Sequence, residues 1–194
     1  MTFLRVPSGA RAIALNTALI AASMRAEVNT MEMLMVRGAN HSCVDDQIRS
    51  PAHHAAYATS SAGYDALALL ADCNAQLEVR DLSGQTPLHV AAMRGSEEAT
   101  RCLLESAVDV DVNDDKGCVP LHYAAQGGHV QVCALLIEYG ATVRATNTVG
   151  QSPMSMARSA RPHHKGHGLV IEHLAEAYVT ASPVIAGVTA TETK

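Results

Sequence analysis

The stretch DLSGQTPLHVAA, residues 81–92, recurs 33 positions later as DDKGCVPLHYAA, residues 114–125. A weaker third copy, NTVGQSPMSMA, occupies residues 147–157, and DDQIRSPAHHAA at residues 45–56 fits the same frame upstream. Self-similarity at a fixed period of this length is typical of repeat architectures, in which each unit is one small supersecondary motif. The sequence therefore predicts a stack of similar units, each packed against its neighbours.

Each unit encodes two short helices. Thr86 is placed to cap the first helix, and Pro87 follows at the position where a missing N–H group is tolerated. Gly95 can end this helix in the left-handed conformation, and Glu97 and Glu98 place negative charge at the start of the second helix. Both helices are shorter than the ~12–15 residues needed for marginal stability in isolation. We therefore expect their stability to come from stacking.

The two best copies resemble the ankyrin repeat, a unit of 33 residues with the motif T-P-L-H-x-A. The resemblance covers about residues 12–178 and implies a mostly α fold, an α-solenoid of stacked helix pairs with short β-hairpin arms. Residues 1–11 are expected to be a lead-in and residues 179–194 a flexible tail. The five expected units, of which the terminal ones diverge from the motif, are 12–44, 45–80, 81–113, 114–146 and 147–178.

Composition excludes several functional classes. The chain has 194 residues, a net charge of -5, one Phe and no Trp, so it lacks the basic stripe and the stacking aromatics of a nucleic-acid binder. Five cysteines without a CxxC pair indicate a reducing compartment, the cytoplasm or the nucleus. No apolar run approaches the ~20 residues that cross a bilayer. Residues 1–26 carry no acid, which leaves open whether they form a mitochondrial targeting segment or a capping repeat.

Histidines form two groups. His53, His89 and His122 recur at the motif position, and the resemblance implies that they hydrogen-bond the turn backbone and link adjacent units. A second group surrounds an insertion in the fifth unit, where Pro162, Gly166 and Gly168 interrupt any helix that could clasp a metal. Its members are His163, His164, His167 and His173.

Two further groups of side chains are of types that could carry chemistry. Cys118 lies on a predicted arm and is expected to be the most exposed thiol, whereas Cys102 and Cys133 fall on core positions of outer helices. Asp45, Asp81 and Asp114 begin the arms, where a short Asx side chain forms the turn without any ligand. We predict no catalytic residue, no metal ligand and no cofactor.

The resemblance implies a non-catalytic protein–protein interaction module, an adaptor, scaffold or inhibitor that binds a partner protein through the concave side formed by the arms and the inner helices. The chain is expected to be monomeric by itself, with no nucleic acid or membrane as partner. One alternative is a permanent subunit or assembly factor of a larger complex, and another is a metal- or redox-responsive enzyme that uses the His163–His173 insert and Cys118. The predicted partner-binding residues are Arg49, Tyr57, Leu82, Gln85, Met93, Arg94, Lys116, Cys118, Tyr123 and Gln126.

Overall fold

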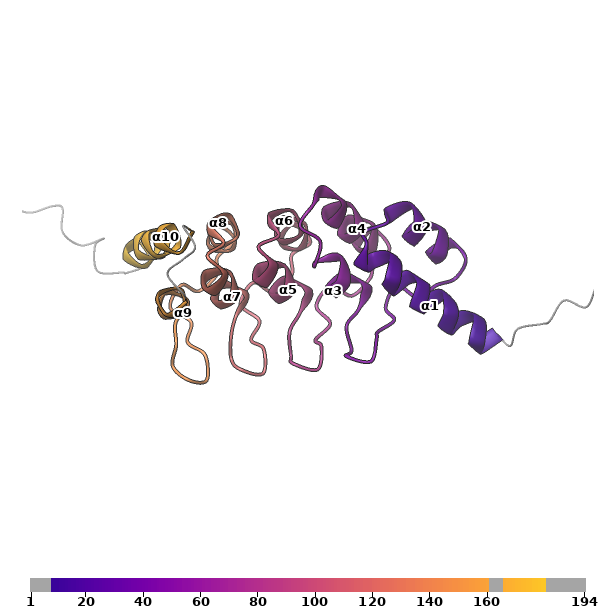
Figure 1. Cartoon of the computed structure of the whole chain (residues 1–194), viewed down its shortest axis with the longest axis horizontal. Coiled ribbons are helices and arrows are strands. Elements are labelled where there is room, and N and C mark those ends of the chain that lie inside the picture. Colours follow the sequence, from indigo (N-terminus) through magenta and orange to yellow (C-terminus); the bar gives the residue numbers. More distant parts are fainter. Residues whose placement is uncertain (1–7, 161–165, 181–194) are drawn as a thin grey trace, which may run out of the picture.

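A computed structural model describes residues 8–160 and 166–180, which form a row of stacked helix pairs (Figure 1). The inner helices are α1 (Ser8–Met24), α3 (Pro51–Ala55), α5 (Pro87–Arg94), α7 (Pro120–Gly127) and α9 (Pro153–Ser159). The outer helices are α2 (Val28–Val36), α4 (Ser61–Asp72), α6 (Glu97–Glu105), α8 (Val130–Glu138) and α10 (Gly166–Thr180). The predicted mostly helical solenoid is confirmed.

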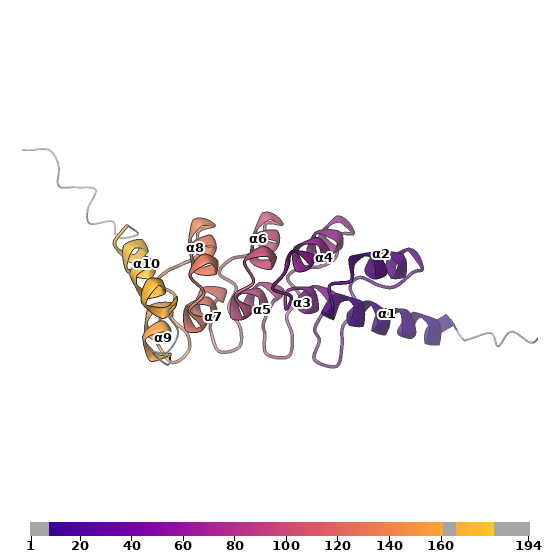
Figure 2. The same ribbon diagram turned by 45° about the horizontal axis from the view of Figure 1, so that its top comes forward.

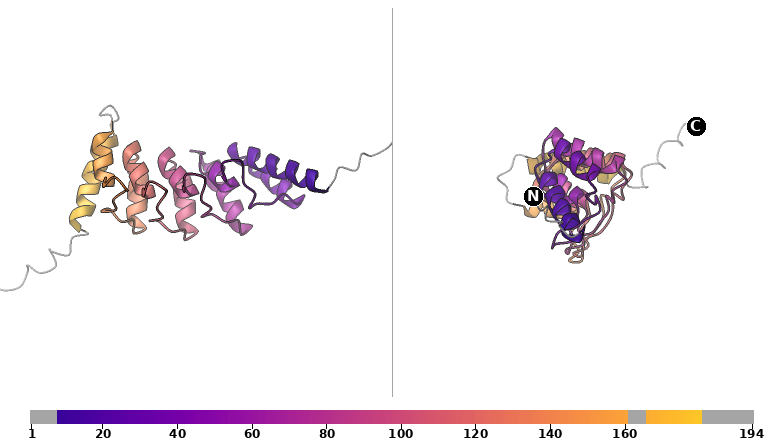
Figure 3. Two further views of the ribbon diagram at one scale, coloured as in Figure 1. Left: turned by 90° about the horizontal axis from the view of Figure 1, so that it is seen from below. Right: turned by 90° about the vertical axis from the view of Figure 1, so that its right-hand side faces the viewer.

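Three layers follow one another across the row: outer helices, inner helices and looped arms (Figure 2). Seen along the row, the arms all lie on one side (Figure 3). The arms comprise residues 45–49, 81–85, 114–118 and 147–151, and each is closed by a hydrogen bond from the N–H of its first residue to the carbonyl of its fifth. No residue within 8–160 or 166–180 is in a strand, so the β-hairpin character expected of the arms is not confirmed.

The core is built from leucines between the layers and alanines between neighbouring inner helices. Leu88, Leu103, Leu121 and Leu136 are fully buried or nearly so, and each belongs to the repeated pattern. Ala91, Ala92, Ala124 and Ala125 are also completely buried, on the helices α5 and α7 that pack against one another. A side chain no larger than a methyl group lets two helix backbones approach closely, which explains a core with few aromatic residues.

Three buried histidines link the second, third and fourth units each to the next unit. The Nδ1 atom of His89 accepts a hydrogen bond from the Thr86 N–H at 3.1 Å, and Nε2 lies 3.0 Å from the Cys118 carbonyl oxygen of the following arm. His53 joins Ser50 to Gln85, and His122 joins Val119 to Gln151, in the same geometry. The structure thus gives these histidines the role that the ankyrin resemblance implied.

Two further sets of hydrogen bonds run along the row. The carboxylates of Glu78 and Asp111 accept from the backbone N–H groups of Asp109 and Thr142, each 31 residues further on. Near the start of the outer helices, Ser96 Oγ donates to the Ala58 carbonyl at 2.7 Å. His129 and His167 make the corresponding contacts, with the carbonyls of Met93 and Gln126.

The terminal units differ from the middle ones. Helix α1 has 17 residues, begins at Ser8 inside the expected lead-in, and projects past α2 (Figures 1 and 2). Helix α10 continues to Thr180. The rest of the expected lead-in and tail, residues 1–7 and 181–194, lies outside the described residues. Among the helices that are described, none has the length and hydropathy needed to cross a membrane.

Arm geometry makes a prediction about Ile48. The fourth residue of each arm has a positive φ, and it is Gly84, Gly117 or Gly150 in three arms but Ile48, with φ +59°, in the first. A left-handed conformation costs a β-branched residue about 1–2 kcal/mol, a cost that glycine avoids. Ile48→Gly should therefore raise the free energy of unfolding by roughly 1 kcal/mol in urea melts. Gly84→Ala adds a side chain at the equivalent position of the next arm and should lower the free energy of unfolding. A loss of stability in Ile48→Gly would contradict this account.

Candidate protein-interaction surface

Arms and inner helices together form one surface, which we call the arm face. Six of the ten predicted partner-binding residues are exposed on it: Tyr57, Leu82, Met93, Arg94, Lys116 and Gln126. The exposed fractions of Tyr57, Leu82 and Met93 are 54%, 56% and 41%, which is high for large apolar side chains. Arg49 and Gln85 are half-buried. The arm face therefore presents large side chains on a backbone that is held in place by the hydrogen bonds of the arms.

Tyr57 and Arg94 connect two units at the edge of the arm face. The Arg94 guanidinium carbon lies 4.3 Å from the centroid of the Tyr57 ring, within range of a cation–π interaction. Tyr57 follows α3 and Arg94 is the last residue of α5. Because each side chain restrains the other, the pair holds an aromatic ring and a positive charge in a fixed arrangement on the exposed surface.

Asp45 organises the first arm through its carboxylate. Its Oδ1 atom accepts from the N–H groups of Gln47 and Arg49 at 2.8 and 2.9 Å, while Oδ2 pairs with the Arg49 guanidinium and with His54 Nε2. Burial raises the pKa of Asp45, but the hydrogen bonds from Arg49, Gln47 and His54 outweigh this effect and lower it to about 2. His54 is thus a buried partner of Asp45.

The expectation that Cys118 is exposed is wrong. Its side chain is 3% exposed, and the amide of Asn147 lies 3.6 Å from its sulfur. Burial raises the pKa of the thiol, which makes it a poor nucleophile at neutral pH. The arm folds back under its own turn because the Asp114 carboxylate binds the Cys118 N–H at 2.8 Å. All five cysteines are free thiols.

Tyr123 is also buried, with 8% exposed, so it does not present the open ring that was predicted for partner binding. Its hydroxyl donates to Asp114 Oδ2 at 2.5 Å and accepts from Gln85 Nε2 at 3.0 Å. Burial and the Asp114 carboxylate both raise the pKa of the phenol. Asp114 and Tyr123 are nine residues apart, the same separation as Asp45 and His54, and this recurring spacing is the signal that could have placed Tyr123 beneath its arm.

The histidine insert gives no support to a metal site in the part of the chain that can be described. His167 is buried and its Nε2 lies 2.9 Å from the Gln126 carbonyl, the same structural role as His129 in the preceding unit. His163 and His164 lie outside the described residues. Within 8–160 and 166–180, no three Cys, His, Asp or Glu residues come together in a group that could hold a metal ion.

The stacked helix pairs and their arms define a helical repeat protein. A family model described as ankyrin repeats, in three copies, matches residues 56–147, which supports the assignment of these units as ankyrin repeats. Among curated proteins, none matches this chain. Ankyrin repeats generally act as protein–protein interaction modules and are typically non-catalytic.

The contribution of the Tyr123 hydroxyl to stability can be tested by removing its oxygen atom. Tyr123→Phe leaves the Asp114 carboxylate and the Gln85 amide without their shared partner, which should cost about 1–3 kcal/mol of unfolding free energy. Tyr139→Phe is the matched control, because Tyr139 is exposed, and it should stay within ~0.5 kcal/mol of the parent chain. Equal denaturation midpoints for the two variants would show that the hydrogen bonds of Tyr123 contribute nothing.

Proposed function

We propose that this chain is a non-catalytic adaptor, scaffold or inhibitor that binds a partner protein through its arm face. The observation that supports this most directly is the row of exposed large side chains formed by Tyr57, Leu82 and Met93. Side chains of this kind dominate the binding energy of protein interfaces when a partner covers them. Lys116 and Gln126 lie on the following unit and extend the same surface with polar groups.

The rigidity of the arms supports the same proposal. Each arm is closed on itself and held by an Asx side chain, and the second, third and fourth arms are each joined to the preceding unit by a buried histidine. A preorganised surface loses little conformational entropy on association, so more of the contact energy appears as affinity. The arm face can therefore bind one partner across several units.

The outer surface of α6 has a different character. Glu97 and Arg101 form an ion pair at 3.0 Å, and Glu105 accepts a hydrogen bond from Tyr64 of the preceding unit. Exposed pairs of this kind contribute little energy and leave no large apolar side chain for a partner. For this reason we place the main interface on the arm face.

A triple variant tests the assignment. The partner is first identified by affinity purification from the native cell with mass spectrometry. Replacing Tyr57, Leu82 and Met93 by alanine should then weaken its capture at least ~10-fold, about 1.4 kcal/mol, because three exposed contact residues are lost. The melting curve should barely move, since none of the three is buried.

The matched control changes Glu98, Arg101 and Glu105 on α6 to alanine and should leave capture intact. If this control loses the partner while the arm-face variant retains it, the protein binds through its outer helices and the proposed surface is wrong.

A permanent subunit of a larger complex is the second proposal, and the first unit favours it. Ile13, Met24, Met33 and Val36 are all more than half exposed on α1 and α2, although a terminal unit normally turns a polar face to water. Under this proposal the chain expressed alone should self-associate in light scattering, and co-expression of its partner should abolish this. A monodisperse monomer with an unchanged melting temperature in the presence of the partner would contradict it.

A further inference from the structure

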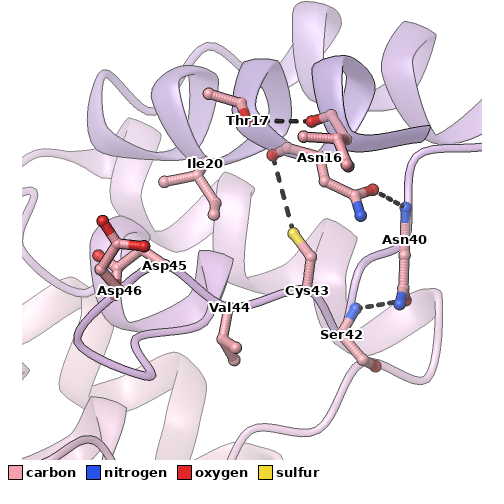
Figure 4. Close-up of a pocket in the computed structure, with 10 residues that line it drawn as sticks. Asn16, Thr17, Ile20, Asn40, Ser42, Cys43, Val44, Asp45 and Asp46 are labelled. Carbon is pink, nitrogen blue, oxygen red and sulfur yellow. Dashed lines mark hydrogen bonds between the residues drawn. The ribbon is translucent and has the colours of Figure 1, made fainter. Parts of the chain in front are cut away.

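The first unit lacks the histidine that links every later inner helix except α9 to the next arm. Ile20 stands in the register of His53, His89 and His122, and an aliphatic side chain cannot donate a hydrogen bond to the first arm. The space beside Ile20 is a pocket of about 550 Å³ between α1 and residues 40–46, open to solvent (Figure 4). Its walls are fixed by a 2.8 Å hydrogen bond from the Asn40 N–H to Asn16 Oδ1.

The same end of the row has an unused backbone donor. Neighbouring arms are joined by one hydrogen bond each: Leu82 N–H to the Gln47 carbonyl, Asp115 N–H to Ser83 and Thr148 N–H to Lys116, at 3.0, 3.1 and 2.9 Å. The equivalent donor in the first arm is the N–H of Asp46. Because α1 is helical from Ser8 onward, the described chain holds no arm before the first one, and the Asp46 N–H has no acceptor within it.

The pocket also carries a negative charge. Asp45 is compensated by Arg49 and His54, but no described residue pairs with the exposed Asp46 carboxylate. Ile13 and Ile20 line the pocket from α1 and supply an apolar surface to the pocket that the two aspartates also line. A ligand that matches these groups offers a carbonyl oxygen to the Asp46 N–H, a cation to its carboxylate and an aliphatic group to the isoleucines.

An extended peptide provides all three groups at the spacing of adjacent residues, by the same logic as a strand that adds to an open sheet edge. We propose that the pocket binds an extended segment of a partner protein that carries a lysine or arginine beside an aliphatic residue. The segment takes the place of the missing preceding arm. This inference rests on the proposed function, since it specifies what the N-terminal end of the arm face recognises.

The test uses a defined probe instead of the unidentified partner. Isotope-labelled protein is titrated with the acetylated, amidated pentapeptide AVKVA, and with AVEVA as its charge-reversed counterpart, while NMR follows the Asp46 amide and the Ile13 and Ile20 methyl groups. We expect saturable shifts at these positions with AVKVA at millimolar concentration. AVEVA should bind at least ~10-fold more weakly, because it places a carboxylate against Asp46.

Asp46→Asn should weaken AVKVA binding about tenfold, as expected for the loss of one charge-assisted contact. The control is Asp115→Asn, the same arm position two units later, which should leave binding unchanged. Equal binding of both peptides, shifts confined to other parts of the chain, or equal effects of the two substitutions would overturn the inference. If AVKVA does not bind but the partner is still captured through the arm face, only this inference is wrong. If AVKVA binds at Asp46 while the arm-face variant still captures the partner, the inference stands and the proposed interface falls.

Discussion

A neutral imidazole that binds two backbone groups at once is the interaction on which the row depends. A backbone N–H can only donate, so His89 Nδ1 must be the acceptor for Thr86, and the ring proton sits on Nε2, where it donates to the Cys118 carbonyl. One side chain thus satisfies the start of a helix in its own unit and fixes the arm of the next. Since helices of 5–8 residues are unstable alone, this coupling and the packing around it hold the units together.

The hydrogen bonds of these histidines also set the geometry of the arm face. The second, third and fourth arms are each held by a histidine of the preceding unit and by their own Asx carboxylate or amide, so exposed residues such as Leu82 and Lys116 project from a fixed backbone. Buried polar groups complete the support: the hydroxyl of Tyr123 joins Asp114 to Gln85 across two neighbouring arms. At Ile20, where the histidine is missing, a pocket lies beside the first arm, and the Asp46 N–H has no acceptor among the described residues.

Much of the fold was readable from the sequence because the repeat period carries local and packing information together. Pro87 and Pro120 marked helix starts, and the recurrence of His89 and His122 pointed to a structural role. The burial of Cys118 on its arm and of Tyr123 on α7 was not predicted, because the repeat motif does not specify the residue at either position. Burial there depends on contacts between units, such as Asn147 with Cys118 and Gln85 with Tyr123, which a single unit's pattern does not encode. His167 was read as part of an insert, because the extra residues before it hid its correspondence to His129.

The dependence of stability on pH tests the central claim most directly. Burial lowers the pKa of His53, His89 and His122, although the hydrogen bonds to the following arms oppose this. These histidines therefore take up protons near pH 6.5 in the unfolded chain but only at lower pH in the folded chain. Their full contribution to the free energy of unfolding is present above about pH 6.5 and decreases as the pH falls below it. Asp45 and Asp114 have lowered pKa values, and their contribution is lost only below about pH 4. We predict that the free energy of unfolding falls between pH 7 and pH 5, by up to about 1.4 kcal/mol per pH unit for each buried histidine. A stability that stays constant or rises as the pH falls from 7 to 5 would contradict the account.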